Sequence, residues 1–186
     1  MDKLFLGLAL VLLDLNISFG SIRIGFLPDF LGFFLIAKSC VSLVTCNQHF
    51  IKVQTAAKLL TVYSGILFLL NLFGIGTQLG VFSLLLNGIR VICSLITIHW
   101  LINGIRQIEQ QRTWDLATTA LQTMLPILAC LHSLSLLLSW IPVIGLLAAL
   151  AATVVSICFL TAFYKTRQLY AENLQKQHPT IDADAI

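Results

Sequence analysis

The chain has 186 residues, of which 58% are hydrophobic and only 10% are charged, and its mean hydropathy is +0.94. Soluble globular domains carry roughly 25% charged residues, so this composition excludes that class and predicts a membrane protein. The formal net charge of +3 comes from scattered residues rather than a basic patch, which gives nucleic-acid binding no support. With no linker-like segment, we expect one domain over residues 1–176 and a disordered cytoplasmic tail over 177–186.

Six apolar stretches approach the ~20 residues that a helix needs to cross a ~30 Å hydrocarbon core. They cover residues 4–19, 28–46, 58–73, 78–102, 116–140 and 142–164. The first also resembles a signal peptide, but it lacks a small-x-small cleavage site and contains Asp14 and Asn16, so we interpret it as a span. The expected fold is therefore all-α, a polytopic transmembrane bundle of six helices in three consecutive hairpins.

The basic residues orient this bundle. With a cytoplasmic N-terminus, nine of the eleven Lys and Arg residues fall on the inner side: Lys3, Lys38, Lys52, Lys58, Arg106, Arg112, Lys165, Arg167 and Lys176. Only Arg23 and Arg90 do not. Positive charge accumulates in cytoplasmic loops, so we expect both termini in the cytoplasm. The turns over 74–80 and 139–145, which would then be external, carry no charge.

Pro28 and Asp29 interrupt an apolar run near the start of the second stretch. One interpretation is a plain helix start, with Pro at the first position, Asp29 in the first turn, and residues 18–27 as an apolar external loop. The other places Asp29 in an outward-opening polar pocket near Arg23. The two are compatible, because Gly25, Asp29 and Gly32 share one helical face that a neighbouring helix could approach closely.

A polar stripe runs along the fourth stretch at helical spacing: Gly80, Ser83, Asn87, Arg90, Ser94 and Thr97. Arg90 lies near the middle of that stretch, where a lone guanidinium costs at least ~2.5–3.5 kcal/mol, so it requires a partner. Asp14 is expected at nearly the same depth, ~15 Å beyond Leu4. We therefore predict an Asp14–Arg90 ion pair, with Asn16 and Asn87 completing its hydrogen bonds.

Two roles for this pair remain open. It could lock the packing of the helices, as buried ion pairs often do. It could instead contact a substrate or move a proton, a role suggested by the rarity of ionisable groups inside membranes.

The remaining chemistry-bearing residues suggest no catalytic site. The five cysteines, Cys40, Cys46, Cys93, Cys130 and Cys158, show no metal-ligand spacing and are interpreted as small buried hydrophobes. His99 and His132 each stand alone on a different helix, and the chain contains neither HExxH nor GxSxG. We expect no cofactor, no metal site and no enzymatic activity.

The run IGFLPDFLGFFLI, over 24–36, follows an upstream LLDLNISFG. Together they resemble a set of uncharacterised small bacterial multipass membrane proteins in which an LPDF-G-[YF] motif begins the second span. This resemblance implies the bacterial plasma (inner) membrane. In size and span number the chain also resembles the S components of energy-coupling-factor vitamin transporters, although their Ala-rich first-helix docking motif is not recognisable in LFLGLALVLLDL.

These observations favour a membrane protein that binds, or helps to transport, a small polar or amphipathic solute. The expected substrate-binding residues are Asp14, Asn16, Asp29, Asn87 and Arg90. The alternative is a non-catalytic partner or assembly subunit of a membrane complex, in which the buried ion pair is structural. The expected partners are accordingly the lipid bilayer, a second membrane protein or a small-molecule ligand.

Overall fold

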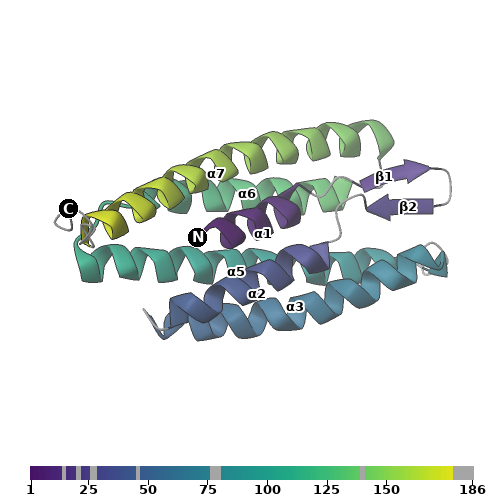
Figure 1. The fold of residues 1–186 in the computed structure, drawn as a ribbon. Helices are drawn as coiled ribbons and strands as arrows, with labels where there is room; N and C mark the ends of the chain where they lie inside the picture. Colours follow the sequence, from purple (N-terminus) through teal and green to yellow (C-terminus); the bar gives the residue numbers. More distant parts are fainter. Residues whose placement is uncertain are drawn as a thin grey trace, which may run out of the picture.

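A computed structural model describes residues 1–13, 16–19, 22–25, 29–44, 47–75, 81–138 and 141–177 of the chain. These residues form six helices, α1 (Asp2–Leu12), α2 (Asp29–Val44), α3 (His49–Leu72), α5 (Val81–Arg112), α6 (Thr118–Leu138) and α7 (Pro142–Gln177). Figure 1 shows their arrangement. Two short strands, β1 (Asn16–Phe19) and β2 (Ile22–Gly25), lie between α1 and α2. The helical class that the sequence predicts is confirmed, with the addition of this one hairpin.

Four of the helices are long and apolar enough to cross a membrane. These segments are His49–Leu72, Phe82–Arg112, Thr118–Leu138 and Val143–Lys176. Many large apolar side chains on their outer faces are exposed, including Leu59, Phe82 and Leu146. Such an apolar exterior is unfavourable in water and suits contact with hydrocarbon, so the structure agrees with a membrane protein.

The first predicted span is wrong in its second half. The helix that was expected over 4–19 ends at Leu12, and its 11 residues rise only ~16 Å. Asn16–Phe19 instead pairs antiparallel with Ile22–Gly25, so the expected external loop over 18–27 is also partly a strand. Polar and apolar residues alternate through both strands, a period of two that suits a strand and not a helix.

Three helices extend beyond the apolar stretches that predict them. Helix α3 begins at His49 rather than at residue 58, and α5 continues from residue 102 to Arg112. Helix α7 runs to Gln177, as the sequence KTRQLYAENLQKQ predicts. The extensions of α5 and α7 are rich in Gln, Lys, Arg and Glu, which favour helix, whereas the extension of α3 is held by its buried residues Phe50, Val53 and Ala57.

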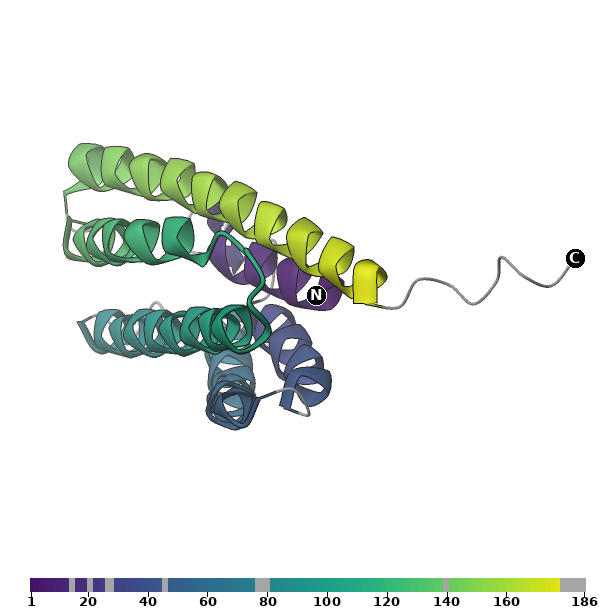
Figure 2. The same ribbon diagram turned by 90° about the vertical axis from the view of Figure 1, so that its left-hand side faces the viewer.

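Each helix packs against the next described helix along the chain, and α1 also packs against α7. Figure 2 shows α6 and α7 on one side of α1, with α2 and α3 on the other. Helices α1 and α2 cross at Gly7 and Gly32, where the backbones approach so closely that a Cβ on either residue would lie within 3 Å of the other's carbonyl oxygen. The close approach expected at Gly32 is thus confirmed.

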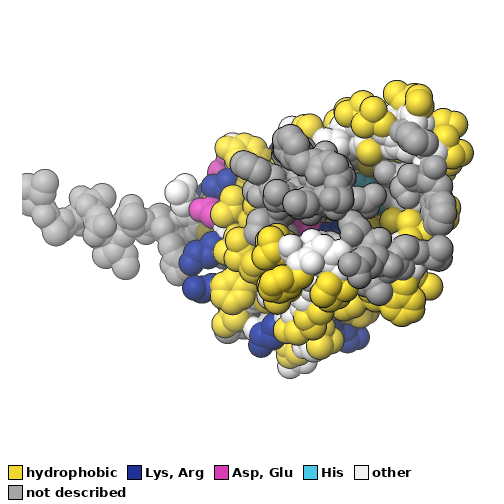
Figure 3. Space-filling view, turned by 90° about the vertical axis from the view of Figure 1, so that its right-hand side faces the viewer, with side chains coloured by type: hydrophobic (Ala, Val, Ile, Leu, Met, Phe, Trp, Pro, Cys, Tyr) yellow, Lys and Arg dark blue, Asp and Glu magenta, His cyan; other side chains and the backbone are white. Residues whose placement is uncertain are grey.

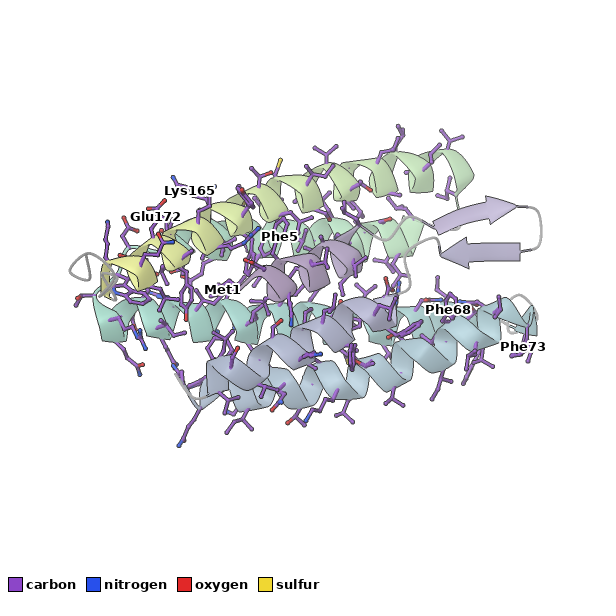
Figure 4. All side chains as sticks on the ribbon, in the orientation of Figure 1. Met1, Phe5, Phe68, Phe73, Lys165 and Glu172 are labelled. Atoms are coloured by element: carbon purple, nitrogen blue, oxygen red, sulfur yellow. The ribbon has the colours of Figure 1, made fainter. Side chains whose placement is uncertain are left out.

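The contact between α1 and α7 joins the two ends of the fold. The rings of Phe5 and Tyr164 pack edge to face, with their centroids 5.7 Å apart. Arg167 Nε donates a hydrogen bond to Asp2 Oδ1 over 2.6 Å. Figure 4 shows Met1 and Phe5 on α1 beside the part of α7 that carries Lys165 and Glu172. The start of α1 and the end of α7 both lie in the left half of Figure 1.

The connection between α5 and α6 is held by a defined cap. Thr113 adopts the left-handed conformation, with φ of 53°, and Trp114 N–H donates to the carbonyl of Glu109. The Glu109 carboxylate then accepts hydrogen bonds from the Leu116 N–H and the Thr118 hydroxyl. This loop is therefore ordered by the last turn of α5.

Candidate functional site

The central charged feature is an ion pair between Arg90 and Asp29, formed by Nη1 of the arginine and Oδ2 of the aspartate. Arg90 lies in the third turn of α5, and Asp29 is the first residue of α2. Two helices that are far apart in the sequence therefore meet through opposite charges. This contact places a carboxylate within the apolar part of the bundle.

Both side chains of the pair are largely buried. Asp29 is 9% exposed and Arg90 is 19% exposed. Among the described residues, the second carboxylate oxygen of Asp29, Oδ1, is buried and has no hydrogen-bond partner. A buried carboxylate oxygen without a donor is costly, on the order of 1–3 kcal/mol, so this atom is a candidate acceptor for a further group.

Asp29 also lies at a favourable end of its helix. The sequence predicted that it would occupy the first turn of the second helix, and the structure confirms this. The amino end of a helix carries a partial positive charge, which stabilises a carboxylate there. The carboxylate thus receives two positive influences, one from the helix and one from Arg90.

The other predicted site residues are placed less completely. Asp14 lies outside the described residues, so the Asp14–Arg90 pair stays a prediction. Asn16 is described only through the backbone of β1. Asn87 does not turn toward Arg90 in the hydrogen bond that is seen, because its Nδ2 donates to the carbonyl of Ser83 over 2.8 Å.

Two further described members of the polar stripe, Ser94 and Thr97, bond back to α5 itself. Ser94 Oγ donates to the carbonyl of Val91 and Thr97 Oγ1 to that of Cys93, at 2.7 and 2.8 Å. Hydroxyls that bond back to their own helix are a common solution inside membranes. These two hydroxyls are therefore satisfied even when α5 is surrounded by apolar groups. Arg90 is the charged residue of the stripe.

The sequence interpretation missed Asp29 as a partner of Arg90. It counted the second span outward from Pro28, as if that residue lay at the outer surface. In the structure, Asp29 is 15 residues, ~22 Å, from the carboxyl end of α2 at Val44. Arg90 is 12 residues, ~18 Å, from Ile102, and this similar depth was the signal available.

The histidines and cysteines form no metal centre in the described part of the chain. His99 Nε2 lies 2.9 Å from Asn103 Nδ2, and His132 Nδ1 lies 3.1 Å from the carbonyl of Leu128. No group of three or more His, Cys, Asp or Glu side chains is gathered among these residues. The expectation that cysteines are buried holds for Cys40 and is wrong for Cys130 and Cys158, which are exposed.

Figure 3 views the molecule from the end that carries the β1–β2 hairpin. Hydrophobic side chains cover much of the described surface at this end, and acidic, basic and histidine atoms show near its centre. Strand β2 packs against α3, so the hairpin lies against the bundle.

Comparisons with protein-family models, with curated protein sequences and with solved structures found no match.

Proposed function

We propose that this chain is a multipass protein of the bacterial plasma membrane that binds a small polar or amphipathic solute, or assists its transport, at the Asp29–Arg90 pair. One observation carries the proposal: a largely buried ion pair retains an unused acceptor, Oδ1 of Asp29. Ionisable groups at membrane depth are expensive and commonly mark ligand or ion pathways. Asp14, Asn16 and Asn87 complete the proposed binding site.

The pair suggests the chemistry of the solute. Arg90 offers a planar donor fork that suits a carboxylate or phosphate group. Asp29 offers an acceptor that suits a hydroxyl, amide or ammonium group. A solute carrying both kinds of group can bind without leaving either charge uncompensated, because it replaces part of the ion pair by its own contacts.

The threading follows from the positive-inside bias. We propose three antiparallel hairpins, α1 with α2, α3 with α5, and α6 with α7, and both termini in the cytoplasm. The first crossing combines α1, ~16 Å long, with β1, which adds ~13 Å. In this arrangement the hairpin lies in the outer half of the membrane, and the solute site opens toward the outside.

A second candidate is a non-catalytic subunit of a membrane complex, supported by the completed bond between Arg90 Nη1 and Asp29 Oδ2. A pair that is already joined can tie α2 to α5 without any ligand. The resemblance to small bacterial multipass membrane proteins fits both candidates equally.

Native mass spectrometry of the full chain, purified from its own membranes, separates the two candidates. The solute proposal predicts a small retained mass that is lost in Asp29→Asn and Arg90→Gln but kept in Arg167→Gln, which breaks an exposed pair. A folded Asp29→Asn variant that retains the same mass would overturn it. A stable copurifying protein, with no small mass in any variant, would favour the subunit.

A further inference from the structure

A second polar site lies toward the other end of α5. It is a pocket of about 330 Å³ lined by His49, Lys52, Trp100, Asn103, Arg106, Gln107 and Gln110. Arg106 is 16 residues, ~24 Å, along α5 from Arg90, so this pocket is separate from the ion pair. It is formed where the first turn of α3 faces the last third of α5.

The pocket has a one-sided charge. Lys52 and Arg106 are both cationic at neutral pH, and none of the lining residues is acidic. The amino end of α3 adds a partial positive charge, because that helix begins at His49. The nearest acid along α5, Glu109, is engaged by Leu116 and Thr118 in the α5–α6 loop. An anion is therefore the group that this pocket stabilises.

Hydrogen-bond donors remain for such an anion. Arg106 uses Nη1 to bond Gln122 Oε1 at 3.0 Å, which engages one of its five N–H donors. Gln107 accepts a bond from Asn47 Nδ2 through its Oε1, at 2.9 Å, so its own amide N–H₂ group is directed elsewhere. A phosphate group, with several acceptor oxygens, matches this set of donors better than a halide or a single carbonyl does.

The pocket also lies at the boundary between apolar and polar surface. Trp100, 39% exposed, is the lining residue that lies furthest toward the apolar part of α5. From there an exposed row of isoleucines continues along the same face of α5: Ile96, Ile92 and Ile89. Toward the other side α5 becomes polar from Asn103 to Arg112. Tryptophan is typical of the membrane interface, where lipid headgroups lie.

We propose that this pocket binds a phosphate group carried by an anionic phospholipid. The headgroup phosphate lies between Lys52 and Arg106, and the acyl chains lie along the isoleucine row below Trp100. A free phosphate ester shares the charged half of this chemistry but leaves the apolar row unused. The adjoining apolar surface is what favours the lipid as the source of the phosphate.

The test uses the full-length protein in detergent and native mass spectrometry, with phosphatidylglycerol and phosphatidylcholine added at equal concentration. The wild type is expected to retain phosphatidylglycerol in preference. One basic residue near a membrane surface accounts for about a fivefold change in anionic-lipid affinity, so Lys52→Gln is expected to lower binding about fivefold. Lys58→Gln is the matched control, since Lys58 is exposed on α3 and does not line the pocket.

Arg106→Gln is a second variant that should also lower phosphatidylglycerol binding, but it removes the hydrogen bond from Arg106 to Gln122 as well. Lys52→Gln leaves that hydrogen bond intact and is therefore the more specific variant. Equal binding of the two lipids by the wild type would overturn the proposal, as would equal loss in Lys52→Gln and Lys58→Gln. Displacement of phosphatidylglycerol by an equimolar amount of glycerol 3-phosphate would assign the pocket to a soluble phosphate ester instead. Each outcome leaves the Asp29–Arg90 proposal untouched, because that site is tested by other variants.

Discussion

Gly7 and Gly32 face each other where α1 crosses α2, and a Cβ built on Gly32 would lie 2.8 Å from the carbonyl oxygen of Gly7. The obstacle is backbone, which cannot rotate away as a flexible side chain can. Because α1 and α2 are short, they share only a small contact surface. The close approach of their backbones at the two glycines therefore contributes strongly to their packing. The two glycines therefore fix the point at which α1 and α2 cross.

Gly32→Ala is expected to lower the free energy of unfolding by roughly 1–3 kcal/mol, because the added methyl group forces the two backbones apart. Gly65→Ala is the control: its Cβ would lie 3.9 Å from Cβ of Phe30, an ordinary van der Waals distance, and alanine favours helix over glycine by up to about 1 kcal/mol. Unfolding in mixed micelles of increasing SDS fraction measures both. Equal stability of the two variants would contradict the close crossing.

Breaking the Asp29–Arg90 pair from one side is expected to be costly. Asp29→Asn or Arg90→Gln alone should reduce stability by about 3 kcal/mol, since each leaves the other charge buried. The double variant should lose clearly less than the sum of the two, by at least about 1 kcal/mol in a double-mutant cycle. Losses that simply add would show that the two side chains act independently.

The exposed pair between Asp2 and Arg167 supplies the comparison for that cycle. Asp2 is 79% exposed, so solvent screens its interaction and Asp2→Asn should cost less than about 1 kcal/mol. The same micelle titration measures it. A loss as large as that of Asp29→Asn would mean that burial does not distinguish the two pairs.

Replacement of Thr113 by glycine is expected to increase the stability of the protein. Its φ of 53° is strained for a β-branched residue but ordinary for glycine, so Thr113→Gly should stabilise the protein by about 1 kcal/mol. Ala120→Gly, in the first turn of α6, should instead destabilise by up to about 1 kcal/mol. Thermal unfolding followed by circular dichroism gives the sign, and a destabilised Thr113→Gly would argue against the left-handed cap.

The carboxylate of Glu109 is expected to stabilise the α5–α6 connection. Glu109→Ala removes the acceptor for Leu116 N–H and for the Thr118 hydroxyl and should cost about 2 kcal/mol. Glu172→Ala, at an exposed position on α7, should be close to neutral. Proteolysis rates at the α5–α6 connection provide a local readout, and only Glu109→Ala should increase them.

The proposed threading predicts which loops reach the outside. On a cysteine-free background, Ile75→Cys should react with a membrane-impermeant maleimide in intact cells, whereas Arg112→Cys should react only after the membrane is permeabilised. Ile75 and Arg112 are both exposed and lie beyond opposite ends of the apolar layer. The reverse pattern of labelling would invert the topology.

Hydropathy recovered most of the helices but not their ends. It detects long apolar stretches and so missed the first turns of α3, where Lys52, Gln54 and Thr55 alternate with buried residues, and the last ten residues of α5, which are helical because of propensity rather than apolar content. It also joined residues 4–19 into one span. Gly20 and Ser21 separate two alternating segments by the two residues that a tight hairpin needs, a signal that mean hydropathy does not contain.

The site was predictable in part. The need of Arg90 for a carboxylate followed from its position in an apolar stretch, and the placement of Asp29 at a helix start followed from Pro28. Their meeting did not follow, because it depends on how deeply α2 begins within the bundle. The pocket around Lys52 and Arg106 was missed because its residues come from helical extensions that hydropathy does not register.

The contact of α1 with α7 has a consequence for biosynthesis. Asp2 is separated from its partner Arg167 by 165 residues of sequence, and the Phe5 ring likewise meets Tyr164 from the other end of the fold. With only 11 residues, α1 is too short to settle in a bilayer unaided. Helix α1 can pack against α2 as soon as α2 has been made, whereas its contacts with α7 can form only after residues 164–167 have been translated.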